Sequence, residues 1–228
     1  MNSSQLPSLG PENSAGCSAA PGECEIGYFI SLSEKIPGWT RGEEAAELAR
    51  LSFQQGTDAV IVEIGSFLGS GTIILAGPRR LRGSGKVHCI DSFDCSGDAF
   101  SVPHYQRILT SLGGGNLRNH FDDNIRSAGL AAWVEVHQGS ARMISANWHT
   151  PIDLLFLDGD QSRAGAREAY DSWSPFLRPG GIIAIHNSHP DNHPIDHDGN
   201  WHLVETVVHP PSYAEIHRIT STTFARRG

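Results

Sequence analysis

The 228-residue chain has little positive charge. It carries 17 lysines and arginines against 25 acidic residues, which gives a formal net charge of -8 at pH 7. Nucleic-acid binding draws most of its affinity from clustered lysine and arginine, so this balance disfavours a nucleic-acid partner. No apolar run approaches the ~20 residues that cross a bilayer, so a membrane partner is not expected either. A small-molecule ligand is favoured.

Cysteine is scarce, and its four positions form no paired C-x-x-C motif: Cys17, Cys24, Cys89 and Cys95. This pattern predicts reduced thiols in a cytoplasmic protein. The first residues lack the basic start and apolar core of a secretion signal. We expect residues 1–25 to form a disordered leader and residues 26–228 to form one domain, with 26–56 as an N-terminal lid segment that contains a helix over 42–55.

Apolar runs alternate with helical segments along the rest of the chain. The β-branched run at 59–64 is typical of a strand that is covered on both faces. Repeated β-α units imply a parallel sheet with right-handed crossovers. The predicted parallel strands are 59–64, 86–91, 133–137, 152–157 and 181–186.

A helix over 201–209 and two closing strands, 213–219 and 221–225, follow. Little more than a turn separates these strands, so they should pair antiparallel. The predicted fold is therefore a Rossmann-like α/β domain with a doubly wound, seven-stranded, mostly parallel sheet and a C-terminal antiparallel pair. The stretch 93–130 is longer than one crossover helix needs, and we expect two helices around a glycine joint that cover the substrate.

A glycine-rich turn follows the first predicted strand, with the sequence Glu63-Ile-Gly-Ser-Phe-Leu-Gly-Ser-Gly-Thr72. Glycines at a strand-to-helix turn allow close approach of a ligand, and the helix that follows presents free N–H groups. The pattern therefore indicates a nucleotide-like ligand. A dinucleotide fingerprint would need a third glycine where Ile74 stands, so a nicotinamide-dependent oxidoreductase is disfavoured.

An acidic residue followed by G-x-x-x-G-x-G resembles motif I of the class I S-adenosylmethionine-dependent methyltransferases. Three further motifs resemble that family in the same order: Asp91 at the end of the second strand, 153–158 as motif IV, and 176–183 leading into the fifth strand. The resemblance implies S-adenosylmethionine as cofactor, with Asp91 accepting from the ribose hydroxyls and Ser140 near the adenine. The implied cofactor-binding residues are Glu63, Gly65, Ser66, Phe67, Gly69, Gly71, Thr72, Asp91, Ser92, Ser140 and Asp158.

Two strand ends should bring reactive side chains together at the carboxyl edge of the sheet. Asp158-Gly-Asp-Gln161 ends the fourth strand, and His186-Asn187-Ser-His189 ends the fifth. The pairing resembles the small-molecule O-methyltransferases of the catechol and natural-product sugar type, in which carboxylates at these ends hold magnesium. Related sugar enzymes have a histidine where Gln161 stands, and acidic residues are usual where this chain has His186.

The resemblance leaves two mechanisms open. In the first, a divalent metal, Mg or Mn, bound by Asp158 and Asn187, with His186 as a further candidate ligand, lowers the pKa of a substrate hydroxyl. Histidine, however, favours a borderline metal or none. In the second, no metal is present and His186 or His189 takes the proton. The catalytic candidates are thus Asp158, His186 and His189.

The expected reaction is O-methylation of a hydroxyl on a small secondary metabolite. The alternatives are N-methylation without a metal and a non-catalytic cofactor-binding domain. Many relatives form homodimers, and this chain is a candidate for the same. The histidine-rich segment after the fifth strand should form a wall of the substrate pocket, and Trp39 either packs over a ligand or holds the lid segment in place.

Overall fold

The computed structural model describes residues 23–191, 194 and 196–228. Helix α1 (Glu23–Ser33) begins inside the predicted leader, so residues 23–25 are helical rather than disordered. The remainder of that prediction, residues 1–22, lies outside the described residues. The predicted lid segment contains part of α1 and all of a second helix, α2 (Gly42–Gln54).

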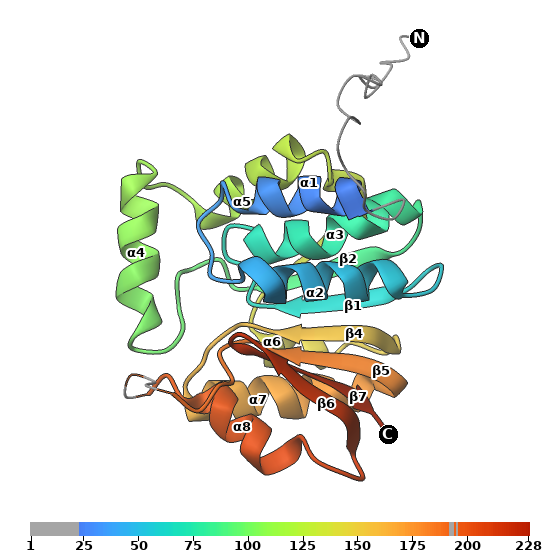
Figure 1. The fold of residues 1–228 in the computed structure, drawn as a ribbon. Helices are drawn as coiled ribbons and strands as arrows, with labels where there is room; N and C mark the ends of the chain where they lie inside the picture. The colour runs from blue at the N-terminus through green and yellow to red at the C-terminus, as the bar shows by residue number, and fades with distance from the viewer. Residues whose placement is uncertain (1–22, 192–193, 195) are drawn as a thin grey trace.

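A seven-stranded sheet crosses the molecule, with the strand order β3-β2-β1-β4-β5-β7-β6 (Figure 1). Strands β1 to β5 pair in parallel, whereas β7 lies antiparallel to both β5 and β6. The predicted Rossmann-like fold is confirmed. The strands are β1 (Val60–Ile64), β2 (Lys86–Asp91), β3 (Val134–Gln138), β4 (Ile152–Leu157), β5 (Leu177–Ile185), β6 (Tyr213–Ile219) and β7 (Thr222–Arg227).

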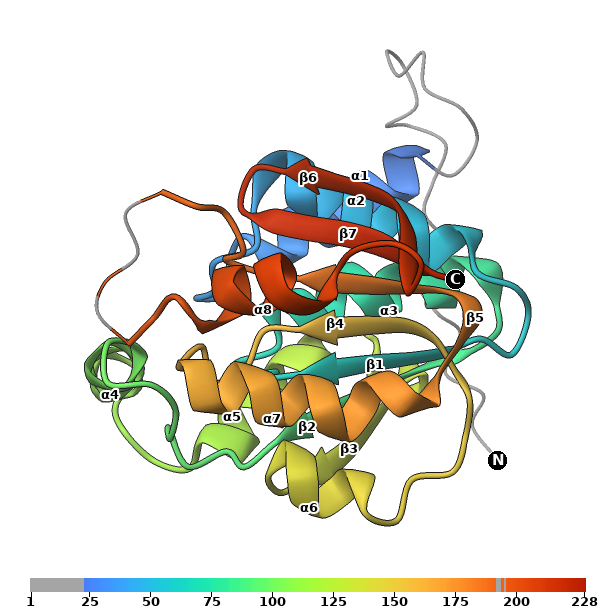
Figure 2. The same ribbon diagram turned by 90° about the horizontal axis from the view of Figure 1, so that it is seen from below.

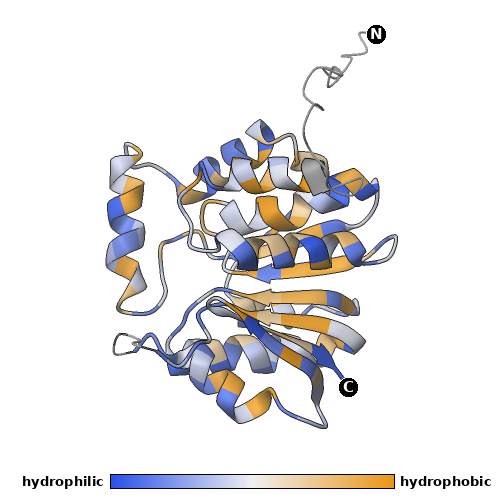
Figure 3. Cartoon of the chain, in the orientation of Figure 1, coloured by the Kyte–Doolittle hydropathy of each residue, from blue (hydrophilic) through white to orange (hydrophobic). Residues whose placement is uncertain are grey.

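Helices cover both faces of the sheet because successive residues of the central strands β1, β4 and β5 are mostly apolar and point to opposite faces. These strands are coloured largely as hydrophobic in Figure 3. Ile61 packs into the layer of α1, α2, α3 (Ser70–Arg82) and α5 (Leu117–Ser127). Val62 packs into the opposite layer, formed by α6 (Ala141–Ser145), α7 (Arg163–Trp173) and α8 (Gly199–Val207). Short 3-10 turns at Ala131–Trp133 and Ser174–Phe176 precede β3 and β5.

Helix α4 (Ser101–Ser111) stands apart from both layers, beyond the carboxyl ends of the parallel strands (Figures 1 and 2). The predicted stretch 93–130 does form two helices, α4 and α5, with Gly113, Gly114 and Gly115 between them, all at positive φ. Within the described ranges, no helix is long and apolar enough to cross a membrane.

The fully buried Arg79 of α3 connects this helix to the end of α2. Its guanidinium donates to the carbonyl oxygens of Ser52 (2.7 Å), Gln55 (3.2 Å), Gly56 (2.7 Å) and Ser84 (2.9 Å). These carbonyls lie at a helix end and in turns, where the backbone leaves them without an intrahelical partner. One side chain therefore satisfies carbonyls of the loops that precede β1 and β2.

Arg79→Met is expected to lower the free energy of unfolding by about 3 kcal/mol, because hydrogen bonds to a charged group are lost and buried carbonyls are left unsatisfied. Urea denaturation would measure the change. Arg82→Met, at an exposed position of the same helix where the guanidinium contacts only the Phe53 ring at 5.4 Å, should cost less than about 1 kcal/mol. Equal losses in the two variants would contradict this role for Arg79.

Candidate active site

A cavity of about 640 Å³ opens at the carboxyl ends of the parallel strands, between the sheet and α4. Most of the predicted site residues line it: Glu63, Gly65, Ser66, Phe67, Gly71, Asp91, Ser92, Ser140, Asp158, His186 and Asn187. Three predicted residues do not: Gly69, Thr72 and His189. The parallel topology has therefore gathered residues from five strand ends into one site.

The glycine turn passes so close to its neighbours that side chains are excluded at two positions. Gly65 has a φ of 89°, and a Cβ there would collide with the backbone of Asp158. A Cβ at Gly71 would collide with the Glu63 carboxylate. The turn therefore packs directly against the ends of β1 and β4, and its other side faces the cavity, where a ligand can approach the backbone.

Glu63 supports this turn from below. The side chain is buried and accepts hydrogen bonds from the hydroxyls of Thr72 and Ser66, the latter at 2.7 Å. Burial raises the pKa of Glu63 to about 7, and the two hydroxyl bonds oppose that shift. Thr72 thus reaches the site indirectly, by orienting Glu63.

Asp91 ends β2 and holds the turn from the front. Its Oδ2 accepts from the backbone N–H groups of Ser66 (2.9 Å) and Phe67 (2.8 Å), and its Oδ1 from that of Phe93 (2.6 Å). Burial raises the pKa of Asp91, while these three bonds favour the ionised form. An ionised carboxylate has about four acceptor positions, so capacity remains for ligand hydroxyls.

Ser140 is the N-cap residue of α6, which follows β3. Its Oγ caps the helix by accepting from the Met143 N–H at 3.2 Å, and the residue lines the cavity next to Gly139 and Ala141. The half of the cavity beside the glycine turn, which we call the first half, therefore combines three features. They are a turn whose backbone a ligand can approach closely, the strand-end carboxylate of Asp91, and the N-terminus of α6 at Ser140.

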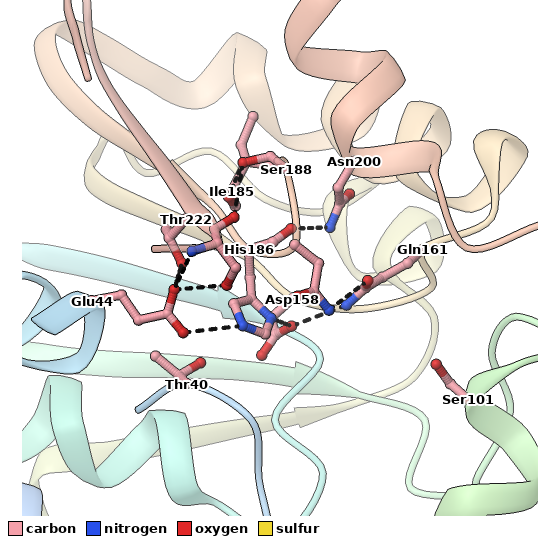
Figure 4. Close-up of polar contacts among 12 residues, drawn as sticks. Thr40, Glu44, Ser101, Asp158, Gln161, Ile185, His186, Ser188, Asn200 and Thr222 are labelled. Carbon is pink, nitrogen blue, oxygen red and sulfur yellow. Dashed lines mark hydrogen bonds and ion pairs between the residues drawn. The ribbon is translucent and has the colours of Figure 1, made fainter. Parts of the chain in front are cut away.

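The second half contains a chain of side-chain hydrogen bonds (Figure 4). His186 Nδ1 donates to Asp158 Oδ1 at 2.6 Å, and Gln161 Nε2 donates to the same oxygen at 3.3 Å. The Gln161 carbonyl oxygen accepts from Asn187 Nδ2 at 3.0 Å. Among the residues that the structure describes, none donates to Asp158 Oδ2. That oxygen is available to a ligand.

Glu44 of α2 completes this chain from the other side of His186. Its Oε1 lies 3.6 Å from His186 Nε2 (Figure 4). Its Oε2 accepts from the Ser221 backbone N–H (3.0 Å) and from the hydroxyls of Thr220 (3.1 Å), Ser221 (2.7 Å) and Thr222 (2.9 Å). Sequence reasoning missed Glu44, although a glutamate beside Ala45 on the apolar face of a helix indicates a buried acid that needs a partner.

His186 is held in the protonated state. Burial alone would lower its pKa, but the carboxylates of Asp158 and Glu44 raise it to about 10. For Glu44, burial opposes ionisation, but His186 and the neighbouring hydroxyls lower its pKa to about 2. At neutral pH the two carboxylates therefore flank an imidazolium cation.

This charge state bears on the predicted metal site of Asp158, His186 and Asn187. An imidazolium has no free lone pair for a metal, and its positive charge repels a cation. Asp158 Oδ1 already accepts two hydrogen bonds, so Asp158 Oδ2 and the Asn187 carbonyl remain as the only donors of the predicted set. The predicted set therefore offers a divalent metal such as Mg²⁺ only two oxygens, and water or substrate would have to supply its other ligands.

The predicted base His189 is half-buried and does not line the cavity. Its Nδ1 accepts from the backbone N–H of Asp191 at 3.3 Å. The geometry thus brings Asp158, His186 and Asn187 together and leaves His189 outside the group.

An aromatic wall covers the cavity from the side of the lid segment and α4. Trp39 packs against Phe67 and Tyr105 with ring centroids 5.8 and 5.6 Å apart, and Phe67 lies 4.8 Å from Tyr105. All three line the cavity. Trp39 therefore lines the cavity, as a residue that packs over a ligand must.

His197, in the segment after β5, lies beside the start of α4 and contributes to the far wall of the cavity. His197 Nδ1 donates to Asp98 Oδ1 at 3.0 Å, and the His197 ring lies 4.8 Å from that of Phe100. Burial opposes ionisation of Asp98, but His197 and the N–H of Ser101 lower its pKa to about 2. His197, but not His189, thus contributes to the predicted pocket wall, and His193 lies outside the described residues.

Acidic side chains outnumber cationic ones in the lining of the cavity. No lysine or arginine is among the described residues that line it, whereas five acidic residues are: Glu63, Asp91, Asp158, Asp160 and Glu168. The imidazolium of His186 already has two carboxylate partners. The cavity therefore favours neutral or cationic ligands over anionic ones.

Comparisons with known proteins show the family and the fold of the chain. A family model described as "Methyltransferase domain" matches residues 62–188. Among solved structures, cofactor-bound Rv0187 from MTB superposes with a TM-score of 0.63 at 16% identity, over 94% of this chain and 93% of that one.

Two further structures are similar at 18% identity and a TM-score of 0.58. One is the O-methyltransferase from Bacillus cereus in complex with SAH, matched over 92% of this chain and 94% of that one. The other is the O-methyltransferase TomG from Streptomyces achromogenes in complex with SAM, matched over 89% of both chains. At these identities the superpositions show a shared fold.

Proposed function

Because the chain belongs to the methyltransferase domain family and is a class I S-adenosylmethionine-dependent methyltransferase, we propose that it methylates a hydroxyl of a small molecule without a metal at the Asp158 site. The observation that carries the proposal is a single cavity with two halves. The first half offers the glycine turn, Asp91 and Ser140 for the cofactor. The second offers Asp158 Oδ2 at the end of β4 for the acceptor. O-methyltransferases of the same fold, bound to SAM or SAH, support it.

When bound, the cofactor would supply a methyl group attached to a sulfonium sulfur. The acceptor oxygen would attack that methyl group in line and displace the sulfur. In the proposed arrangement, Asp91 accepts from the ribose hydroxyls while its backbone bonds keep the glycine turn in place. Asp158 Oδ2 takes the proton of the acceptor hydroxyl as the oxygen attacks. His186 and Gln161 hold Asp158 through Oδ1, which fixes the direction of Oδ2.

His186 acts in this proposal as an internal cation rather than as a base. An imidazole that is already protonated at neutral pH cannot take the substrate proton. Its charge stabilises the Asp158 carboxylate in a buried setting, where a metal would otherwise do so. Glu44 in turn balances that charge from α2.

N-methylation of an amine is a second candidate, favoured by the acidic, lysine- and arginine-free lining of the cavity. Such a cavity attracts an ammonium group, and Asp158 would then hold the cation until it loses its proton. In both cases the acceptor is neutral or cationic with an apolar part that packs against the wall of Trp39, Phe67 and Tyr105.

The deciding experiment is a methyl-transfer assay of metal-stripped protein against panels of neutral phenols, amines and carboxylated phenols, with and without EDTA. We expect turnover of neutral or cationic acceptors that EDTA leaves unchanged. Loss of activity in EDTA with recovery in magnesium would overturn the metal-free mechanism. Preference for the carboxylated acceptors would contradict the charge argument.

Asp91→Ala is expected to weaken binding of S-adenosylhomocysteine by about tenfold or more, since a charge-assisted hydrogen bond contributes about 1.5–3 kcal/mol. Calorimetric titration would measure it. Asp123→Ala is the control, because Asp123 is exposed on α5, pairs with Arg126 on its own helix and lies outside the cavity lining, so this variant should bind normally. Unchanged affinity in Asp91→Ala would remove Asp91 from the cofactor site.

A further inference from the structure

Two histidines and a glutamate meet on the sheet face that α6 covers, away from the active-site cavity. His88 of β2 lies opposite Glu135 of β3, and His137 follows two residues further along the same strand. Their side chains share a face because strand residues alternate. One ligand atom from each of the three lies within 4.8 Å of the other two. None of the three lines the cavity.

The two imidazoles are already close to the separation that one metal ion would need. His88 Nδ1 lies 3.0 Å from His137 Nε2, with the rings stacked at a centroid distance of 5.3 Å. Zinc binds histidine nitrogen at about 2.0–2.1 Å, so two nitrogens on one tetrahedral ion lie about 3.4 Å apart. The distance between the two nitrogens would have to increase by only a few tenths of an ångström for both to bind one ion.

The surroundings hold the imidazoles in place and leave the third donor accessible. The Trp148 ring packs edge-on against His88 and His137 at centroid distances of 5.0 and 5.7 Å. The Glu135 side chain is 48% exposed, and its contact with the half-exposed Lys86 at 3.9 Å is a surface ion pair, which stabilises little because water screens it. Glu135 is therefore free to turn toward the histidines at little cost.

We propose that His88, Glu135 and His137 bind a divalent transition-metal ion of borderline softness, with zinc as the fitting example. Two imidazoles and one carboxylate suit Zn²⁺, Cu²⁺ or Ni²⁺ better than Mg²⁺. Three protein ligands leave a fourth position for water on the exposed side. The ion would join β2 to β3, which is the edge strand of the sheet.

The test uses the full chain after chelation and dialysis, titrated with ZnCl₂ by calorimetry and with CuCl₂ under electron paramagnetic resonance. We expect one site, with a copper spectrum showing two nitrogen ligands. His137→Ala should lower the zinc affinity by more than ~10-fold, the loss that is typical when a residue that hydrogen-bonds to a metal ligand is removed. Glu135→Gln, at an exposed position that folding does not depend on, should weaken binding similarly.

His149→Ala is the matched control, because His149 is exposed and lies next to Trp148 in the chain. It should bind zinc as the wild type does, and zinc should raise the melting temperature of both but not of His137→Ala. Equal zinc affinity in the wild type and His137→Ala would overturn the proposal, as would a copper spectrum with fewer than two nitrogens. Binding that Asp158→Asn abolishes would place the ion in the cavity instead.

Discussion

Asp158→Asn is expected to lower kcat by about 10³-fold while the dissociation constant for the cofactor changes little. General-base catalysis typically contributes 10²–10⁴-fold. An asparagine at this position still offers a carbonyl oxygen to Gln161 and His186, so the hydrogen bonds are kept while the negative charge and the ability to take a proton are lost. Single-turnover methyl transfer, together with calorimetry of S-adenosylhomocysteine binding, separates the two effects.

Asp171→Asn is the charge-matched control, because Asp171 is exposed on α7 and pairs only with Arg167 on its own helix. It should retain full activity. If Asp158→Asn kept more than a third of the wild-type kcat on a hydroxyl acceptor, Asp158 would not be the proton acceptor. If Asp158→Asn kept the full wild-type kcat with an amine acceptor but lost activity with a hydroxyl acceptor, N-methylation would be favoured as the natural reaction.

The fold and the cofactor half of the site could be predicted because they depend on local patterns. Continuous β-branched runs predict buried parallel strands, and the carboxyl ends of such strands meet at one edge. That rule alone brings Asp91, Asp158 and Asn187 to the same cavity, as the structure shows. Boundaries were less accurate: β5 starts at Leu177 rather than at 181, because Leu177 pairs with Ile152 before a bulge.

The charge state of His186 could not be predicted, because it depends on a residue from a distant element. Glu44 lies on α2, and only the packing of α2 against the β6–β7 turn brings its carboxylate to the imidazole. Without Glu44, a strand-end histidine beside an aspartate looks like a base or a metal ligand. The same limit applies to His88 and His137, whose proximity depends on strand register.

Glu44→Gln is expected to lower the free energy of unfolding by about 3 kcal/mol near pH 6, because breaking one partner of a buried ion pair leaves an uncompensated charge. The glutamine either loses hydrogen bonds with the β6–β7 turn or places its N–H₂ group against the N–H of His186. The pKa of His186 should fall as well. Urea denaturation and NMR titration of the histidine would measure both, with the exposed neighbour Glu43→Gln as control, expected within about 0.5 kcal/mol.

The pH dependence of that loss distinguishes a charge interaction from simple packing. Glu44 has its pKa lowered from 4.5 to about 2, so its stabilising contribution is complete above pH 4.5 and is lost as the pH falls toward 2. His186 has its pKa raised from 6.5 to about 10, so its contribution is complete below pH 6.5 and is lost as the pH rises toward 10. The difference between the wild type and Glu44→Gln should therefore be largest from about pH 4.5 to 6.5 and shrink on both sides. A loss that stays constant from pH 4 to 10 would mean that Glu44 acts through its hydrogen bonds to the turn and not through His186.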